Sequence, residues 1–151
     1  PETHLVPTIV YKAIYNKKIY IYGNDFSTPD GTCIRDYIHI NDICSAIEKS
    51  TNYLLNNKKS IIFNIGSHKG LSNNEIVDYI KKTIKNKIDL SYVKRRKGDV
   101  SRLICDSNQI YKTLNWRAKN SHLKKIITNE ILWIKKFKKK GLNRTFKNYL
   151  K

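Results

Sequence analysis

Acidic residues are scarce in this sequence, whose 151 residues include 12 Asp and Glu against 30 Lys and Arg, for a net charge of +18. The excess lies toward the C-terminus: residues 1–93 carry 12 basic and 9 acidic residues, whereas residues 94–151 carry 18 and 3. Such asymmetry raises the hypothesis of a surface that binds nucleic acid or another polyanion. Because the basic residues fall largely on the polar face of one expected helix, we favour a solvated, lysine-rich surface and consider nucleic acid an unlikely partner.

Cysteine is also rare, and methionine is absent. The three cysteines (Cys33, Cys44 and Cys105) form no C-x-x-C pair, which argues against a disulfide framework and against a structural zinc site, so we expect reduced and mostly packed thiols. The sequence has no signal peptide and no run of 18 apolar residues, so we expect no membrane insertion and a cytoplasmic location. Since Pro1 stands first and no linker precedes the apolar stretch, we expect that the chain begins in the middle of a longer protein.

The six glycines form neither a G-x-x-G-x-x-G nor a G-x-G-x-x-G stretch, so the sequence offers no loop for a dinucleotide pyrophosphate. No tyrosine is followed four positions later by a lysine, the helical spacing that lets an ammonium group lower the pKa of a phenol. We therefore predict no catalytic, cofactor-binding or metal-binding residues within this chain.

Hydrophobic periodicity predicts alternating short strands and helices. Asn41 and Asp42 are expected to cap the second helix, and Ser72 with Glu75 forms a capping box for the third. The pattern favours a mixed α/β lobe without the repeated βαβ units of a full doubly wound sheet. The expected helices cover residues 5–15, 43–54, 72–84, 107–114 and 121–140, and the expected strands cover residues 19–22, 35–40, 61–65, 88–93 and 103–105.

One long motif is specific. Residues 22–42 read YGNDFSTPDGTCIRDYIHIND, and this stretch resembles the hallmark of the UDP-glucose 4-epimerases, members of the extended short-chain dehydrogenase/reductase superfamily. Three further regions are similar in the same order: residues 2–5, residues 63–66, and residues 95–99 followed by 114–116. The resemblance therefore spans nearly the whole chain.

The resemblance implies that residues 1–151 are the C-terminal, UDP-sugar-binding portion of such an enzyme, without its N-terminal Rossmann portion. Residues 1–60 would include elements that complete the nucleotide-binding domain. The parent enzyme would interconvert UDP-glucose and UDP-galactose through a 4-keto intermediate, with NAD held by the N-terminal part, and would be a homodimer. The present chain is expected to bind substrate and to be inactive alone.

The resemblance also implies a substrate site. Arg35 and Arg96 would hold the diphosphate, since a guanidinium group presents a planar fork of donors to phosphate oxygens. Asp99 would accept hydrogen bonds from the ribose of uridine. The alternative for each arginine is a surface salt bridge or a solvated loop.

The resemblance implies further residues of this site. Backbone groups at residues 20–22 would line the uracil pocket, with Tyr22 and Tyr37 nearby and His4 and Leu5 approaching the nucleotide. Leu103 stands near the sugar where some relatives have an aromatic residue, and its size bears on whether N-acetylated sugars fit. His39 is expected to be structural, because the sequence offers it neither a nucleophile nor a carboxylate partner.

Three alternatives stay open at this point. The first is a sister UDP-sugar enzyme such as a 4,6-dehydratase or a decarboxylase. The second is a basic module that binds polyanions, whose affinity would fall steeply with salt and would show no preference for uridine. The third is an inactive remnant, since a lobe separated from its partner exposes apolar surface.

Overall fold

The structure is a computed structural model that describes residues 4–139. These residues form a mixed α/β fold of five helices and five short strands, which confirms the predicted fold class. The helices are α1 (Leu5–Ile14), α2 (Ile40–Asn57), α3 (Asn73–Thr83), α4 (Asn108–Leu114) and α5 (Leu123–Lys139). The strands are β1 (Ile19–Tyr22), β2 (Ile34–Asp36), β3 (Gly70–Ser72), β4 (Leu90–Val93) and β5 (Arg102–Leu103).

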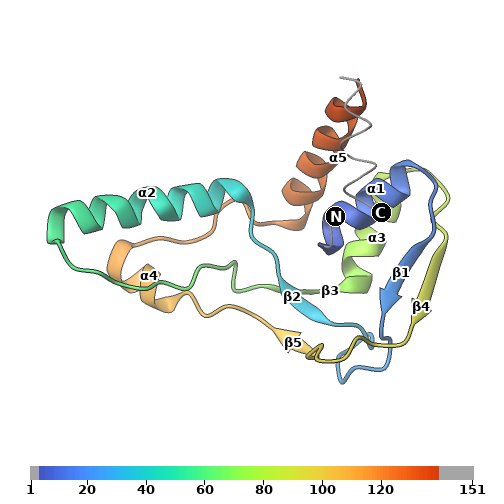
Figure 1. Cartoon of the computed structure of the whole chain (residues 1–151), viewed down its shortest axis with the longest axis horizontal. Helices are drawn as coiled ribbons and strands as arrows, with labels where there is room; N and C mark the ends of the chain where they lie inside the picture. The colour runs from blue at the N-terminus through green and yellow to red at the C-terminus, as the bar shows by residue number, and fades with distance from the viewer. Residues whose placement is uncertain (1–3, 140–151) are drawn as a thin grey trace.

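The main core lies where α1, α3 and α5 pack together beside the parallel pair β1 and β4 (Figure 1). In α1 the buried side chains of Val6, Ile9, Val10 and Ala13 recur at helical spacing, so one stripe of the helix faces this core. Strand β1 alternates, with Ile19 and Ile21 buried and the tyrosines between and after them exposed. The opposite face of β1 is therefore available for a site.

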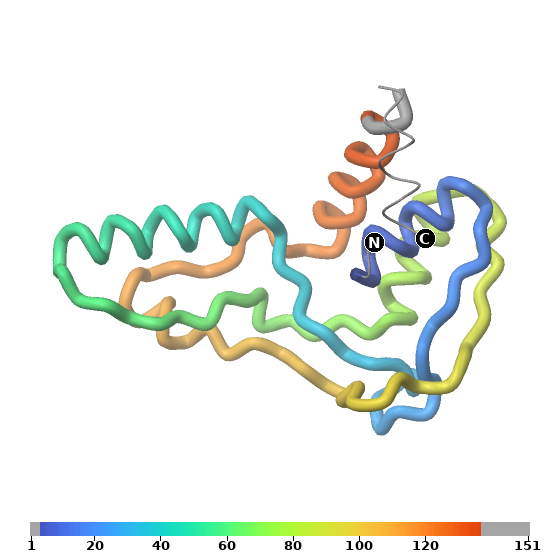
Figure 2. The backbone as a smooth tube through the Cα atoms, in the orientation of Figure 1, coloured from blue at the N-terminus to red at the C-terminus, as the bar shows by residue number. Residues whose placement is uncertain are grey.

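A second sheet has the strand order β3-β2-β5, in which β2 runs antiparallel to β3 and parallel to β5. From the end of β2 the chain turns away into α2, which extends to the left in Figures 1 and 2 and has residues 58–66 and α4 running beneath it. A small cluster of Ala46, Ile110 and Trp116 packs between α2 and α4. The second sheet thus links the main core to this extended arm.

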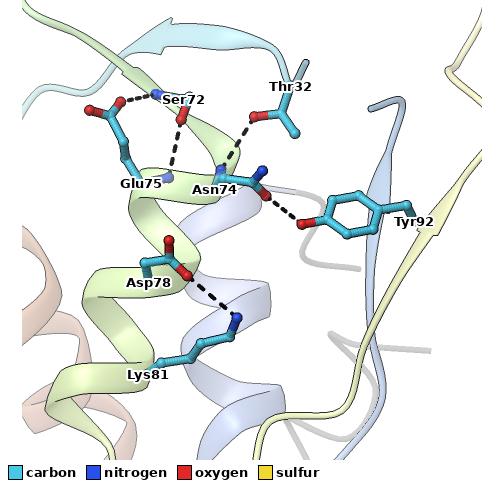
Figure 3. A network of polar contacts seen from close by, with 7 residues as sticks. All are labelled: Thr32, Ser72, Asn74, Glu75, Asp78, Lys81 and Tyr92. Carbon is cyan, nitrogen blue, oxygen red and sulfur yellow. Dashed lines mark hydrogen bonds and ion pairs between the residues drawn. The ribbon is translucent and has the colours of Figure 1, made fainter. Parts of the chain in front are cut away.

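Helix α3 begins at the predicted capping box (Figure 3). The backbone N–H of Glu75 donates to Ser72 Oγ at 3.1 Å, and the backbone N–H of Ser72 donates to Glu75 Oε2 at 2.6 Å. Another N–H of the first helical turn, that of Asn74, donates to Thr32 Oγ1, and the Asn74 side chain accepts a hydrogen bond from the Tyr92 hydroxyl. This network connects the start of α3 to the 23–33 loop and to β4. The adjacent residue Asn73 lines the cavity described below.

Three expectations about secondary structure are wrong. The strand expected at residues 35–40 ends at Asp36, since β2 covers Ile34–Asp36 and Ile40 already begins α2. Residues 61–65 form no strand, and Ile62 is 86% exposed, because neither sheet of the described region offers a neighbouring strand to take their backbone hydrogen bonds. Helix α2 is capped by His39 rather than by Asn41 or Asp42: His39 Nδ1 accepts from the backbone N–H of Asn41 at 3.1 Å. Asp42 is instead buried in the first turn, where it accepts hydrogen bonds from residues 119–121.

The thiols are only partly as expected. Cys33 is buried and Cys105 is partly covered, but Cys44 is exposed, because it lies on a face of α2 that no described residue covers. The predicted end of the last helix, Lys140, lies outside the described residues, as do the first two residues, Glu2 and Thr3, of the 2–5 motif. No helix within residues 4–139 combines the length and the hydropathy that crossing a membrane requires.

Candidate substrate-binding site

Six of the eight predicted site residues line one cavity of about 290 Å³. They come from segments far apart in the sequence: Leu5 from α1, Tyr22 from β1, Arg35 and Tyr37 from β2 and the residues after it, and Arg96 and Asp99 from the loop after β4. Pairing of β1 with β4 carries this last loop to the end of β1, and the backbone N–H of Ile34 donates to the Ser101 carbonyl at 2.8 Å. The sheets therefore bring both arginines to the same hollow.

Arg96 lies over an aromatic ring, with its guanidinium carbon 3.9 Å from the centroid of the Tyr22 ring. This cation–π contact and the extended backbone of β1 fix the direction of the guanidinium group. Tyr22 faces the cavity because alternate residues of a strand point to opposite sides and Ile21 is the buried one. The strand pattern of β1 thus positions a cation at the rim of the cavity.

Arg35 and Asp99 face each other across the cavity with Nη2 and Oδ1 3.8 Å apart, too far for a hydrogen bond. Their side chains are 24% and 34% exposed, so this ion pair contributes at most about 1 kcal/mol and can be exchanged for contacts with a ligand. Arg35 also donates from Nη1 to the Ile34 carbonyl at 2.9 Å, which leaves other guanidinium donors for an anion. With Lys12 included, three cations and one carboxylate line the cavity.

Burial raises the pKa of Tyr37 to about 12, although the charge of Arg35 partly opposes the shift. Burial likewise raises the pKa of the Cys33 thiol, which lines the same cavity. Both groups are therefore protonated at neutral pH, and neither is a base or a nucleophile there. The cavity has the chemistry of an anion-binding site.

The adjacent arginines of the 95–99 motif have different partners. Arg95 donates from Nε to Asp25 Oδ1 at 3.1 Å and from Nη2 to Oδ2 at 2.6 Å, and its guanidinium lies 4.6 Å from the Phe26 ring centroid. These hydrogen bonds hold the pKa of Asp25 below its ordinary value. Gly23, with φ +83°, allows Phe26 this close, since a Cβ there would lie 2.3 Å from its ring. Arg95 therefore fixes the 23–33 loop while Arg96 faces the cavity.

The two other predicted site residues lie elsewhere. His4 lines a larger hollow of about 760 Å³ that is bordered by Arg35, Tyr37 and Trp133. Leu103 is 62% exposed on β5 and lines a third hollow, also bordered by Arg35. Since Arg35 borders all three hollows, both residues lie near the cavity without lining it.

The sequence reasoning missed three polar residues of the cavity: Thr8, Lys12 and Asn73. Thr8 and Lys12 lie one helical turn apart on α1, on the same stripe of the helix as Leu5. Their spacing from Leu5 is a signal that could have found them once Leu5 was assigned to the site. Among residues 4–139 no group of three His, Cys, Asp or Glu residues could hold a metal ion.

His39 is structural, as expected. It is 7% exposed, it caps α2 through Nδ1, and its Nε2 lies 2.9 Å from the side-chain amide of Asn129. The backbone N–H of His39 donates to Ser121 Oγ at 2.8 Å, so the residue joins the start of α2 to the segment before α5. Both ring nitrogens are thus occupied within the fold.

Comparison with known proteins identifies the family to which this chain belongs. The family described as GDP-mannose 4,6 dehydratase matches residues 2–129, and the chain belongs to this family. A UDP-glucose 4-epimerase from Streptococcus mutans serotype c is 39% identical over 134 residues, which cover 88% of this chain and 40% of that protein.

Solved structures agree with this comparison. The crystal structure of a UDP-glucose 4-epimerase superposes with a TM-score of 0.85 at 37% identity, over 90% of this chain and 42% of that one. The epimerase from Stenotrophomonas maltophila, solved with bound NAD and formylated UDP-arabinopyranose, has a TM-score of 0.86 at 27% identity and is matched over 91% of this chain and 41% of its own. The chain thus resembles UDP-glucose 4-epimerases over most of its length and spans about 40% of theirs, which fits their C-terminal portion.

Proposed function

We propose that this chain binds UDP-glucose and UDP-galactose as the substrate-binding portion of an NAD-dependent UDP-glucose 4-epimerase. The observation that carries the proposal is the convergence of Arg35, Arg96 and Asp99 on one cavity. Two guanidinium groups there match the two phosphates of a UDP-sugar, because each can bind phosphate oxygens through paired hydrogen bonds. Curated and solved relatives that carry the name UDP-glucose 4-epimerase support this substrate class.

The remaining residues would hold the nucleoside and the sugar. Asp99 would accept hydrogen bonds from the ribose hydroxyls once Arg35 turns toward the diphosphate. The exposed face of β1 would lie along the uracil, with Leu5 supplying apolar contact and Tyr37 donating its phenolic proton. His4 and Leu103 would approach the ligand from the neighbouring hollows, and the size of Leu103 would then decide whether an N-acetylated sugar fits.

The residues of this chain do not fit NAD, since its six glycines include no pyrophosphate loop. We propose that NAD and the catalytic residues belong to the part of the relatives that this chain does not span. This chain would then hold the diphosphate in place while the sugar is released and rebound in the opposite orientation, and it would be inactive alone. A cytoplasmic homodimer remains our prediction for the longer protein.

Isothermal titration of the chain with UDP tests the proposal. We expect Arg35→Ala and Arg96→Ala each to weaken UDP binding by about tenfold or more, because each removes charge-assisted hydrogen bonds. Arg117→Ala is a matched control: its guanidinium also lies 3.9 Å from an aromatic ring, that of Tyr111, but outside the cavity. The UDP affinity of the Arg117→Ala variant should equal that of the unmodified chain.

Two results would contradict the proposal. One is an unmodified chain that does not bind UDP. The other is a chain that binds heparin as well as UDP, with affinities that fall together as salt rises, which would favour the polyanion-binding alternative. Circular dichroism of each variant separates a lost contact from a lost fold.

A further inference from the structure

A further positively charged group of the cavity, Lys12, comes from α1. Lys12 lines the cavity, and its Nζ lies 5.4 Å from the centroid of the Tyr20 ring. Tyr20 and Tyr22 point to the same side of β1 and are separated by one buried residue, so their Cα atoms lie about 7 Å apart along the strand. Lys12 at Tyr20 and Arg96 at Tyr22 therefore mark two separate positive positions along one wall.

Thr8 lies beside Lys12, one helical turn earlier, and lines the same cavity. Its hydroxyl oxygen is buried and has no hydrogen-bond partner among the described residues. A buried hydroxyl without a partner is unfavourable, and most buried polar groups have a partner in the protein, in ordered water or in a ligand. At the wall of a cavity, a bound ligand can supply that partner.

These positions distinguish the two ends of a nucleotide. Arg96 lies over the Tyr22 ring, the backbone N–H of Asp99 donates to the Arg96 carbonyl at 3.3 Å, and Asp99 lies 3.8 Å from Arg35. These contacts place the proposed diphosphate site at the end of the cavity near Tyr22. In a nucleoside diphosphate the ribose separates the phosphates from the base, so a ligand anchored there reaches Tyr20 with its base. An ammonium group only donates hydrogen bonds, so Lys12 suits a carbonyl oxygen and is a poor partner for an amino group.

We propose that Lys12 and Thr8 recognise the base of the nucleotide and select uracil over cytosine. The inference rests on the proposed function, because it takes the diphosphate position from it. Lys12 donates to the O4 carbonyl of uracil, whereas cytosine presents an amino group at that position. Thr8 donates its hydroxyl proton to a second acceptor on the nucleoside. Together they make the face of α1 a determinant of specificity.

Calorimetric titration of the chain with UDP, CDP and inorganic pyrophosphate tests Lys12. We expect Lys12→Met to weaken UDP binding by about tenfold and to leave CDP binding within about twofold, so that the preference for UDP largely disappears. Lys12→Arg should keep the preference, since it keeps the donors. Lys18→Met is the matched control, because Lys18 Nζ lies 5.8 Å from the same Tyr20 ring but does not line the cavity. That variant should bind UDP and CDP as the unmodified chain does.

Thr8→Val tests the hydroxyl group through two effects of opposite direction. Removing an unpartnered buried hydroxyl should leave the melting temperature of the free chain unchanged or raise it. The same change should weaken UDP binding by about threefold to tenfold. A lowered melting temperature would show that the fold uses this hydroxyl, and an unchanged UDP affinity would show that the ligand does not. Either result overturns the role of Thr8.

The outcomes separate this inference from the proposed function. If the unmodified chain binds UDP but Lys12→Met keeps its preference over CDP, the inference is wrong and the proposed function stands. If Lys12→Met weakens UDP, CDP and pyrophosphate equally, Lys12 contacts phosphate and the inference is again wrong. If the unmodified chain does not bind UDP, both the inference and the proposed function are wrong.

Discussion

The two ends of the molecule are built differently. The lobe, made of α1, β1, α3, β4 and α5, buries 13 apolar side chains in one cluster. The arm, made of α2, residues 58–66, α4 and the residues that follow it to Trp116, buries three. Large apolar side chains of the arm face outward, including Leu55 at 69% and Ile62 at 86% exposure. The lobe carries a core of its own, whereas the apolar surface of the arm is not covered within residues 4–139.

The difference matters for function because most of the cavity lies on the lobe. Leu5, Lys12 and Tyr22 belong to lobe elements, and Arg96 and Asp99 follow β4 directly. Only Cys33, Arg35 and Tyr37 come from β2 and its flanks, the link to the arm. The nucleotide site should therefore tolerate loosening of the arm better than damage to the lobe.

The largest expected effect compares two fully buried isoleucines. Ile127 in the lobe and Ile110 in the arm are both 0% exposed. We expect Ile127→Ala to lower the free energy of unfolding by about 4 kcal/mol and Ile110→Ala by about 2 kcal/mol, because the smaller cluster can collapse around the cavity that the substitution leaves. Urea denaturation followed by circular dichroism measures both. Equal losses would show that the arm is as tightly coupled as the lobe.

The second-largest expected effect concerns the hydrogen bonds that connect the arm to the segment before α5. Asp42, in the first turn of α2, accepts hydrogen bonds from the backbone N–H groups of Lys119 at 3.1 Å and Asn120 at 2.8 Å and from Ser121 Oγ at 2.6 Å. Burial alone would raise the pKa of Asp42, but the hydrogen bonds from Ser121 and Asn120 outweigh it and hold that pKa below its ordinary value. The charged carboxylate therefore stabilises the fold.

The sign of the pH dependence follows. A carboxyl group with a lowered pKa in the folded state contributes stability above its unfolded pKa, and this contribution is lost as pH falls through the folded value. Asp42→Asn should cost about 1–3 kcal/mol at pH 7 and progressively less below pH 4. Asp78→Asn, which removes an exposed carboxylate paired with Lys81, should cost almost nothing at either pH. Thermal unfolding at several pH values tests this, and an Asp42→Asn penalty that does not shrink in acid would contradict it.

The sequence predicts the helices better than the strands. Helices α1, α3, α4 and α5 agree with the expected ranges to within a few residues, because their apolar residues recur at helical spacing. The strand expected at residues 61–65 is wrong, because an apolar run shows neither that a strand will pair with it nor that it is buried, and Ile61 and Ile62 are exposed. The expected N-caps of α2, Asn41 and Asp42, lie two and three residues after the observed N-cap, His39. Both have suitable side chains, but His39 has the extended backbone of an N-cap.

The candidate site divides in a similar way. Arg35, Arg96 and Asp99 could be assigned because they stand inside long motifs with a specific resemblance. Thr8 and Lys12 carry a weaker signal: their helical spacing from Leu5 places them on one stripe of α1, but the spacing alone does not say that this stripe faces a cavity rather than solvent. That knowledge requires the pairing of β1 with β4 and the position of α1 beside them.

The smallest expected effect lies on the outer surface of the arm. Ile62→Asn should change the free energy of unfolding of this chain by less than about 0.5 kcal/mol, because the side chain is exposed and loses no described contact. It should also leave UDP affinity unchanged, since Ile62 is not at the cavity. Urea denaturation and calorimetry check the two values. A loss of 2 kcal/mol, the size expected for Ile110→Ala, would mean that Ile62 is buried against another surface in solution, and the contrast between lobe and arm would then belong to the isolated chain alone.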